Sequence, residues 1–252
     1  MPPLAPVVRY GDHPDQVANL HLPAPEGGPW PVVLLLHGGF WRDRWDRTLM
    51  TPLARDLAAR GFAAWNVEYR PAGRSGGGWP GTLDDVAAAL EALAGVAEAD
   101  PARVVAVGHS AGGHLALWLA ARRDGTVRLR GAVSLAGVCD LVRADAERLG
   151  DGATRAFLGG SAAEAPARYA AASPAALVPL GVPQLLVHGG RDEVVPPSHS
   201  RDYAATARAA GDDVELVELA EADHEDVVDP GGAAWAAVLG WLAARVGARP
   251  GA

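Results

Sequence analysis

The sequence predicts an α/β protein with a mostly parallel central sheet of about eight strands and helices on both faces. Three observations support this fold class. Apolar runs of strand length alternate with helical patterns along the chain. Several of these runs are apolar throughout, as strands covered on both faces are. With 252 residues, of which 49% are hydrophobic, the chain is long enough to bury one core, so we expect a single domain over residues 1–252.

The predicted elements follow one another in a regular order. Strand-like segments occupy residues 16–22, 31–37, 62–69, 103–108, 131–137, 183–189 and 214–220. Helical patterns occupy residues 47–61, 82–95, 113–123 and 198–211, and an apolar stripe of Trp235, Leu239, Leu242 and Val246 predicts a further helix near the end of the chain. Thr82 with Asp85 fits a capping box at the start of its helix.

Two stretches interrupt this order. Residues 73–81, GRSGGGWPG, have the composition of a flexible loop. Residues 140–178, rich in Ala, Pro and Asp, form a long insertion after the segment 131–137, which we count as the sixth of about eight strands. Because long connections in compact domains are often functional, this insertion is a candidate lid or cap over a pocket; a solvated helical connection is the alternative.

Charge and composition narrow the class of partner. The net charge is -8 and the pI about 5.4, and no arginine-rich block departs from that average, so we expect no nucleic-acid partner. The first residues have neither a basic nor an apolar region of a secretory signal, which favours a cytoplasmic location. The apolar segment 231–247 is too short to span a bilayer, so no membrane is expected. Cys139 is alone and forms no internal disulfide. A homo-oligomer is compatible with the sequence.

The segment GHSAG, residues 108–112, lies between the run VVAV and an alanine-rich helical pattern. A G-x-S-x-G sequence between a strand and a helix is the signature of a nucleophile elbow, in which a tight turn exposes the serine. Gly108 and Gly112 permit the turn, and Ser110 is then the candidate nucleophile. A purely structural glycine-rich turn is the alternative.

A serine hydroxyl needs a base to take its proton and a third group to orient that base. In α/β folds with a nucleophile elbow, the chain order is serine, acid, histidine, and the acid and the histidine each lie on a loop after a later strand. Asp192 follows the strand 183–189, and His224 follows the strand 214–220. Among the other histidines, His199 falls in a helical pattern and should lie at the surface or at a helix cap, and His188 should be a buried, hydrogen-bonded core residue. The carboxylates next to the acid and the base should be solvated loop residues: Glu193, Asp223, Glu225 and Asp226.

Four segments together resemble the α/β-hydrolase superfamily along nearly the whole chain: LLLHGGFW, GHSAGG, HGGRDEVVP and ADHEDVVDP. The HGG-x-W pattern at residues 37–41 is similar to that of kynurenine formamidases. Hormone-sensitive-lipase-like esterases carry a third glycine where this chain has Phe40. GHSAGG is also similar to prolyl-oligopeptidase-type peptidases and to small acetyl or feruloyl esterases.

The HGG segment predicts an oxyanion hole, since glycine lets main-chain N–H groups turn toward a developing negative charge. By position the donors should be Gly39, Phe40 and Ala111, although Gly38 remains an alternative. His37 should brace this loop. Phe40, Trp41 and Trp79 are candidates for an aromatic substrate wall, with core packing as the alternative for Trp41.

These observations predict a serine hydrolase that acts on a small carboxylic ester or aryl formamide through an acyl-enzyme. An arylformamidase-like enzyme and a short-chain carboxylesterase both fit. A small serine peptidase is a further alternative, and a catalytically silent binding module is the alternative of another class. We expect no cofactor and no metal, because the chain has no HExxH, P-loop or clustered His/Cys motif.

Overall fold

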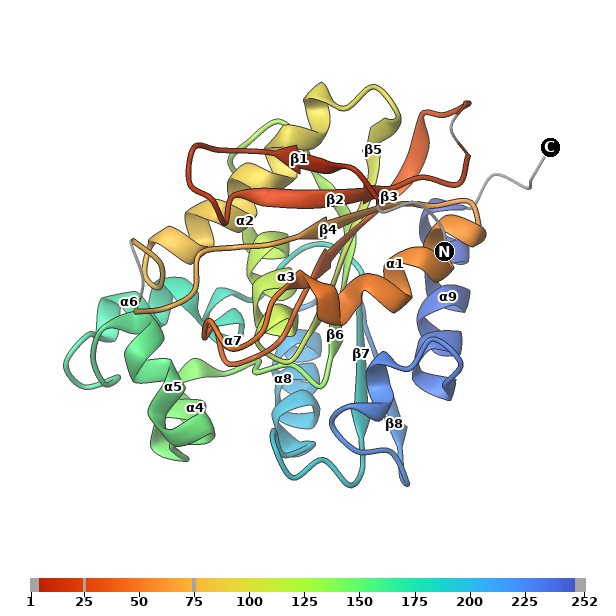
Figure 1. Cartoon of the computed structure of the whole chain (residues 1–252). Coiled ribbons are helices and arrows are strands. Elements are labelled where there is room, and N and C mark those ends of the chain that lie inside the picture. Colours follow the sequence, from red (N-terminus) through yellow and green to blue (C-terminus); the bar gives the residue numbers. More distant parts are fainter. Residues whose placement is uncertain (1–4, 25, 74–75, 248–252) are drawn as a thin grey trace.

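The computed structural model describes residues 5–24, 26–73 and 76–247 (Figure 1). Residues 1–4, part of the segment from which a cytoplasmic location was predicted, and residues 74–75, in the predicted flexible loop, lie outside the described residues. The described residues form an eight-stranded sheet in the order β1-β2-β4-β3-β5-β6-β7-β8. Its strands are β1 (Val7–Arg9), β2 (Val17–His21), β3 (Trp30–Leu36), β4 (Ala63–Val67), β5 (Ala99–His109), β6 (Leu129–Leu135), β7 (Gln184–Gly189) and β8 (Val214–Leu219).

From β4 to β8 across the sheet all neighbours are parallel, whereas β1 and β2 add an antiparallel edge. The predicted fold class is therefore confirmed. The sequence did not indicate β1, because a segment of three residues is too short to show the alternation of a strand.

Helices cover both faces of the sheet, with α1 and α9 on one side and α2, α3 and α8 on the other (Figure 1). The helices are α1 (Thr51–Ala59), α2 (Gly81–Glu91), α3 (Ala111–Ala121), α4 (Leu141–Ala146), α5 (Leu149–Leu158), α6 (Pro166–Ala172), α7 (Pro174–Leu177), α8 (Ser198–Ala209) and α9 (Ala233–Val246), with 3-10 turns at η1 (Arg47–Met50), η2 (Ala92–Gly95) and η3 (Asp226–Val228). In β3, Val33 and Leu35 pack toward α1, while Leu34 and Leu36 pack toward α3. Successive side chains of a strand point to opposite faces, which is why this strand is apolar throughout.

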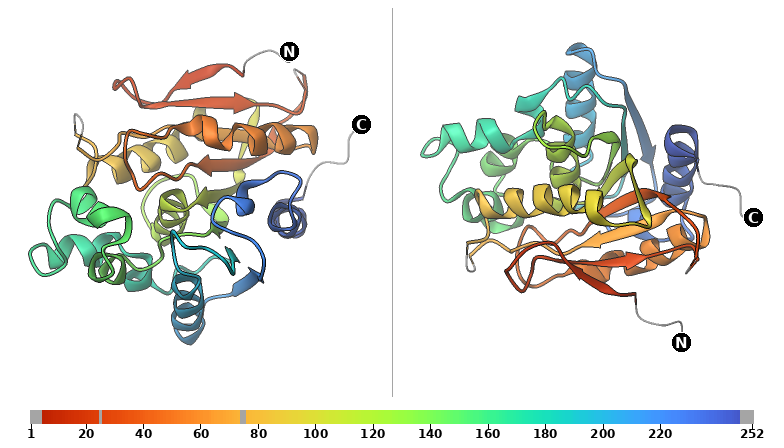
Figure 2. Two further views of the ribbon diagram at one scale, coloured as in Figure 1. Left: turned by 60° about the horizontal axis from the view of Figure 1, so that its bottom comes forward. Right: turned by 90° about the horizontal axis from the view of Figure 1, so that it is seen from above.

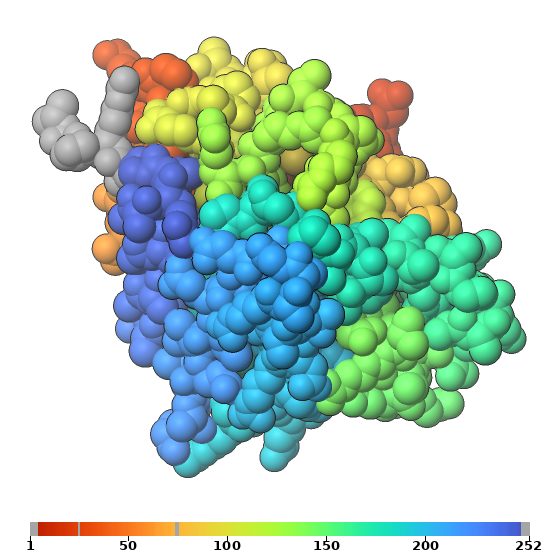
Figure 3. Space-filling view, turned by 180° about the vertical axis from the view of Figure 1, so that it is seen from behind, coloured from red at the N-terminus to blue at the C-terminus, as the bar shows by residue number. Residues whose placement is uncertain are grey.

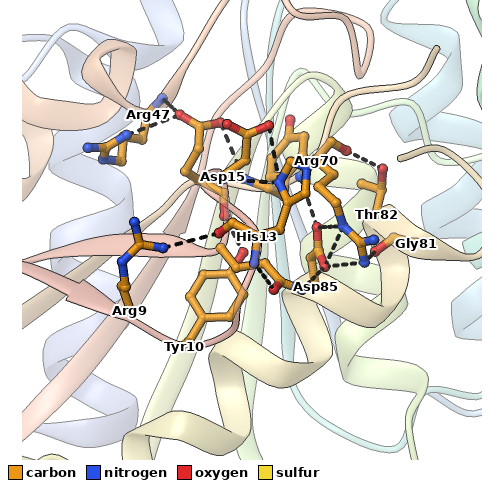
Figure 4. Close-up of polar contacts among 12 residues, drawn as sticks. Arg9, Tyr10, His13, Asp15, Arg47, Arg70, Gly81, Thr82 and Asp85 are labelled. Atoms are coloured by element: carbon orange, nitrogen blue, oxygen red, sulfur yellow. Dashed lines mark hydrogen bonds and ion pairs between the residues drawn. The ribbon is translucent and has the colours of Figure 1, made fainter. Parts of the chain in front are cut away.

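The capping box predicted at the start of α2 is wrong. The Thr82 hydroxyl donates to the carbonyl of Arg70 at 2.6 Å and accepts from the N–H of Gly78 at 2.9 Å. The carboxylate of Asp85, fully buried, accepts hydrogen bonds from the Arg70 guanidinium at 2.6 to 3.0 Å (Figure 4). Both side chains therefore hold the loop before α2, and the helix begins after Pro80 without a side-chain cap.

Helices α4 to α7 make up the predicted insertion and stand to one side of the sheet (Figure 2). They lie beside α8 on the rear face (Figure 3). Arg143 bonds to Asp202 and Ser198, both at 2.6 Å, and Glu147 lies 2.9 Å from Nε2 of His199. His199 is therefore buried under the insertion and does not lie at the surface; of the two expected places, it has the one at a helix end, in the first turn of α8. None of the described helices is long and apolar enough to cross a membrane.

Candidate active site

The strand β5 passes into the helix α3 through Ser110, whose backbone has φ 54° and ψ -116°. This is a strained conformation for a residue with a side chain. The neighbouring glycines are required by close approach: a Cβ atom on Gly108 would lie 2.0 Å from the carbonyl oxygen of Gly112, and one on Gly112 would lie 2.1 Å from that of Leu36. The sharp strand, turn and helix expected from GHSAG are thus present.

Asp192, in the loop after β7, and His224, in the loop after β8, are in direct contact. Nδ1 of His224 lies 2.7 Å from Oδ2 of Asp192, while Oδ1 accepts the N–H groups of Val194 and Val195, both at 2.8 Å. Burial disfavours the charged carboxylate, but the hydrogen bonds from His188, His224 and the main chain outweigh it, so the pKa of Asp192 falls well below its ordinary value. The acid is therefore ionised and fixes a hydrogen on Nδ1 of His224.

His188 is fully buried and hydrogen-bonded, as expected. Its Nε2 lies 2.9 Å from the carbonyl of Val195 and 3.1 Å from Oδ2 of Asp192. Because a carbonyl only accepts, Nε2 must carry the hydrogen, and Nδ1 pairs with the hydroxyl of Ser200 at 2.7 Å. The sequence did not indicate that this histidine would hold the acid in place.

Ser110 and His224 border one cavity of about 410 Å³. Its walls are formed by Gly39, Phe40, Trp45, Leu49, His109, Ser110, Val194, His224 and Glu225. Phe40, Trp45, Leu49 and Val194 contribute apolar side chains to this wall. The folded chain therefore gathers the predicted nucleophile and base, which are more than a hundred residues apart, at one hollow.

The predicted oxyanion loop follows β3. Gly39, Phe40 and Trp41 all have positive φ, at 105°, 53° and 57°. Gly39 and Phe40 line the cavity, whereas Ala111 is fully buried as the first residue of α3, directly after Ser110. Among the hydrogen bonds of the described residues, none uses the N–H groups of Gly39, Phe40 or Ala111.

His37 lies behind this loop. Its ring stacks on Tyr69 with centroids 4.2 Å apart, and its Nε2 lies 2.9 Å from Oε1 of Glu68. Its Nδ1 lies 2.7 Å from the carbonyl oxygen of Gly38. These contacts agree with the expected bracing role.

Trp41 does not line the cavity. It is 1% exposed and stacks on Phe157 of α5 with centroids 4.6 Å apart, so it has no free surface for a substrate. Trp79 packs against the same core, and its main-chain N–H donates to the carbonyl of Phe157 at 2.8 Å. Trp41 is therefore a packing residue. Trp79 is half-buried and does not border the described cavity, and its role in a substrate wall stays a prediction.

Two aromatic side chains border the cavity, Phe40 and Trp45, and the sequence did not single out Trp45. Its ring stands over Gly39, since a Cβ atom on that glycine would lie 2.6 Å from Cδ1 of the ring. The side chain is 45% exposed. Trp45 sits in the polar run RDRWDR without an apolar pattern, and the only signal was a large aromatic residue soon after the HGG motif.

His114 of α3 joins three parts of the molecule. It accepts from Nε1 of Trp41 at 3.2 Å and donates from Nε2 to the carbonyl of Ala172 in α6 at 2.9 Å. Burial lowers the pKa of His114 to about 4, so the ring is neutral. The insertion thus contacts the back of the oxyanion loop. None of its residues borders the described cavity, and its role as a lid stays a prediction.

A second histidine adjoins the base. His109, directly before Ser110, lies 3.0 Å through Nε2 from the carbonyl oxygen of His224, and the two rings are 4.7 Å apart. The carbonyl can only accept, so Nε2 carries the hydrogen. Burial and the nearby His224 lower the pKa of His109 to about 3, and the ring is neutral.

Comparison with known proteins places this geometry in a family. A family model designated BD-FAE matches residues 18–206. The chain belongs to the BD-FAE family. This BD-FAE protein is also 30% identical to esterase LipQ of Mycobacterium tuberculosis over 214 residues, which are 77% of the chain and 50% of LipQ. It therefore spans half the length of that relative.

Two solved structures are similar to this BD-FAE chain. A truncated carbohydrate esterase from gut microbiota has a TM-score of 0.82 at 17% identity, with 95% of each chain covered, and this likeness shows the fold alone. The apo form of Thermogutta terrifontis esterase 2 has a TM-score of 0.79 at 26% identity, with 99% of this chain and 97% of that chain covered. The resemblance to hydrolases is thus confirmed at the level of family and fold, while the likeness to kynurenine formamidases stays a prediction.

Proposed function

We propose that this BD-FAE protein is a serine hydrolase that cleaves small carboxylic esters through an acyl-enzyme on Ser110. The observation that carries the proposal is the hydrogen bond between His224 and Asp192, because His224 borders the same cavity as Ser110. Similarity to LipQ and to Thermogutta terrifontis esterase 2 supports the ester class.

In the proposed reaction, Nε2 of His224 takes the proton of the Ser110 hydroxyl as its oxygen attacks the ester carbonyl. Asp192 holds the hydrogen on Nδ1 and stabilises the imidazolium that forms. The negative oxygen of the tetrahedral intermediate is bound by the N–H groups of Gly39, Phe40 and Ala111, each worth on the order of 10² to 10³ in rate. His224 then protonates the leaving alcohol, and water releases the acid by the same route.

The cavity favours a small substrate with an apolar group. Trp45, Leu49 and Val194 supply the apolar walls, and a volume of about 410 Å³ is in the range of small-molecule sites. An aryl formamide is the second candidate, since the HGG-x-W segment is similar to that of kynurenine formamidases and the exposed ring of Trp45 suits an aromatic substrate.

The test measures labelling by a fluorophosphonate probe of the wild type, Ser110→Ala and Ser161→Ala. Ser161→Ala is the matched control, because it removes a serine that does not border the cavity. Wild type and Ser161→Ala should label, and Ser110→Ala should not. Equal labelling of all three would exclude Ser110 as the nucleophile, and no labelling of the wild type would favour the silent binding module.

The substrate class is tested by turnover of p-nitrophenyl acetate and butyrate against N-formylkynurenine. Ester hydrolysis should be the faster reaction. Ester turnover without formamide cleavage would remove the second candidate, and formamide turnover alone would reverse the order of the two.

A further inference from the structure

The loop after β8 and the end of β5 bring three metal-ligating groups together. One ligand atom from each of His109, His224 and Glu225 lies within 4.8 Å of the other two, on the wall of the cavity. Two imidazoles and one carboxylate are the donor set of a three-ligand zinc site with an open fourth position. The spacing in the sequence conceals this set, because His109 is 115 residues from His224.

The hydrogen bonds already present leave one lone pair on each imidazole. Asp192 accepts from Nδ1 of His224, which leaves Nε2 without a hydrogen. The carbonyl of His224 accepts from Nε2 of His109, which leaves Nδ1 without one. Metal-bound histidines in proteins almost always donate their other N–H to a carboxylate or a carbonyl. Both imidazoles therefore already make the kind of hydrogen bond that orients a metal-bound histidine.

We propose that His109, His224 and Glu225 bind a divalent cation of the zinc class, and that the bound cation inhibits the enzyme. Inhibition follows because the cation occupies the lone pair of His224 that Ser110 needs, so this part rests on the proposed function. Imidazole donors select zinc over magnesium and calcium, which prefer oxygen ligands.

The geometry requires a small adjustment. Zinc bonds of about 2.0 to 2.2 Å place tetrahedral ligand atoms roughly 3.4 Å apart, so the three atoms must approach by on the order of 1 Å. The two histidines are buried, but Glu225 is exposed and its side chain is free to make this movement. All three residues border the cavity, so water from the cavity can complete the coordination.

Binding is measured first on tag-free Ser110→Ala, which has no turnover, because a histidine tag would itself bind zinc. Calorimetric titration with Zn²⁺ should show one equivalent bound, and Co²⁺ should give the visible absorption of a tetrahedral site. In the same background, Glu225→Gln should bind Zn²⁺ at least about tenfold more weakly, which is the loss of metal affinity typical when a group that supports a metal site is removed. Glu221→Gln, an exposed carboxylate outside the cluster, should bind as the parent does.

Inhibition is then measured on p-nitrophenyl butyrate hydrolysis, with each variant compared to its own metal-free rate. Zn²⁺ should lower the wild-type rate, EDTA should restore it, and Glu225→Gln should need at least about tenfold more zinc. No zinc binding to Ser110→Ala, or equal binding by the Glu225→Gln variant, would overturn the site even if the esterase is active. Binding that leaves the rate unchanged would overturn the inhibition. A zinc-free wild type without esterase activity would instead count against the proposed function, and the calorimetry would still decide the site.

Discussion

Replacing Asp192 with asparagine tests the catalytic pair most directly. The carboxylate receives two main-chain N–H groups on Oδ1, from Val194 and Val195, and two imidazole N–H groups on Oδ2, from His188 and His224. Main-chain donors cannot reverse their direction, so the amide oxygen of Asp192→Asn must take the Oδ1 position. The amide NH₂ then faces His224, which must present a lone pair at Nδ1 and carry its hydrogen on Nε2.

This exchange of tautomer removes the base, because Nε2 can no longer accept the proton of Ser110. The loss should be about 10³ to 10⁴ in kcat, equivalent to roughly 4 to 5.5 kcal/mol of transition-state stabilisation, with little change in KM. In chymotrypsin-type enzymes, replacing the acid with asparagine lowers kcat by a comparable factor through the same change of tautomer.

The assay is steady-state hydrolysis of p-nitrophenyl acetate, with circular dichroism to show that the variant is folded. Glu193→Gln is the matched control, since it removes an exposed carboxylate from the adjacent position and should keep the wild-type rate. A folded Asp192→Asn protein with a kcat within about tenfold of the wild type would refute the reasoning, because the tautomer would then not limit the reaction.

Three further outcomes are expected. Gly112→Ala should lose more than about 3 kcal/mol of unfolding free energy in urea titrations, because its Cβ would lie 2.1 Å from a main-chain oxygen. The control is Gly240→Ala, which has open space in α9 and should gain about 0.5 to 1 kcal/mol. Similar unfolding free energies for the two variants would contradict the close approach at Gly112. Phe157→Ala should cost about 3 to 5 kcal/mol and lower kcat more than Phe157→Leu, because the stack on Trp41 supports the oxyanion loop; an unchanged kcat would separate the insertion from catalysis. The pKa of Asp192 lies below its usual 3.8, so the ionised carboxylate stabilises the folded protein fully above about pH 4, and this contribution is lost as the pH falls below that value. The unfolding free energy of Asp192→Asn should therefore fall less steeply with decreasing pH than that of the wild type. Parallel curves of unfolding free energy against pH would contradict the pKa shift.

The parts of the site that depend on local geometry could be predicted from the sequence. Gly108 is required by a contact within the turn, with the carbonyl of Gly112, so part of the conformation around Ser110 is encoded locally; Gly112 is required by the approach of Leu36 at the end of β3. Asp192 and His224 could be assigned because the ends of parallel strands meet at one edge of a sheet. The chain order of the fold then leaves few candidates for the acid and the base.

The parts that depend on distant contacts could not be predicted. Phe40 and Trp41 are adjacent, and positive φ at both turns the first toward the cavity and the second into the core. No residue pattern in the HGGFW segment reports that change of direction. The role of Trp45 likewise depends on where its ring meets Gly39 after folding, and the pairing of His109 with His224 requires the loop after β8.

The contacts behind the oxyanion loop have a consequence for engineering. Trp41 is held by the ring of Phe157 and, through His114, by the carbonyl of Ala172, so the segment 140–178 supplies two supports of the main chain that would bind the oxyanion. A designer who replaces this segment with the connection of another family member, in order to widen the choice of substrates, would also remove those supports. Chimeras that keep an aromatic ring and a free carbonyl at these two positions should preserve turnover, and those that keep neither should be slow on every substrate.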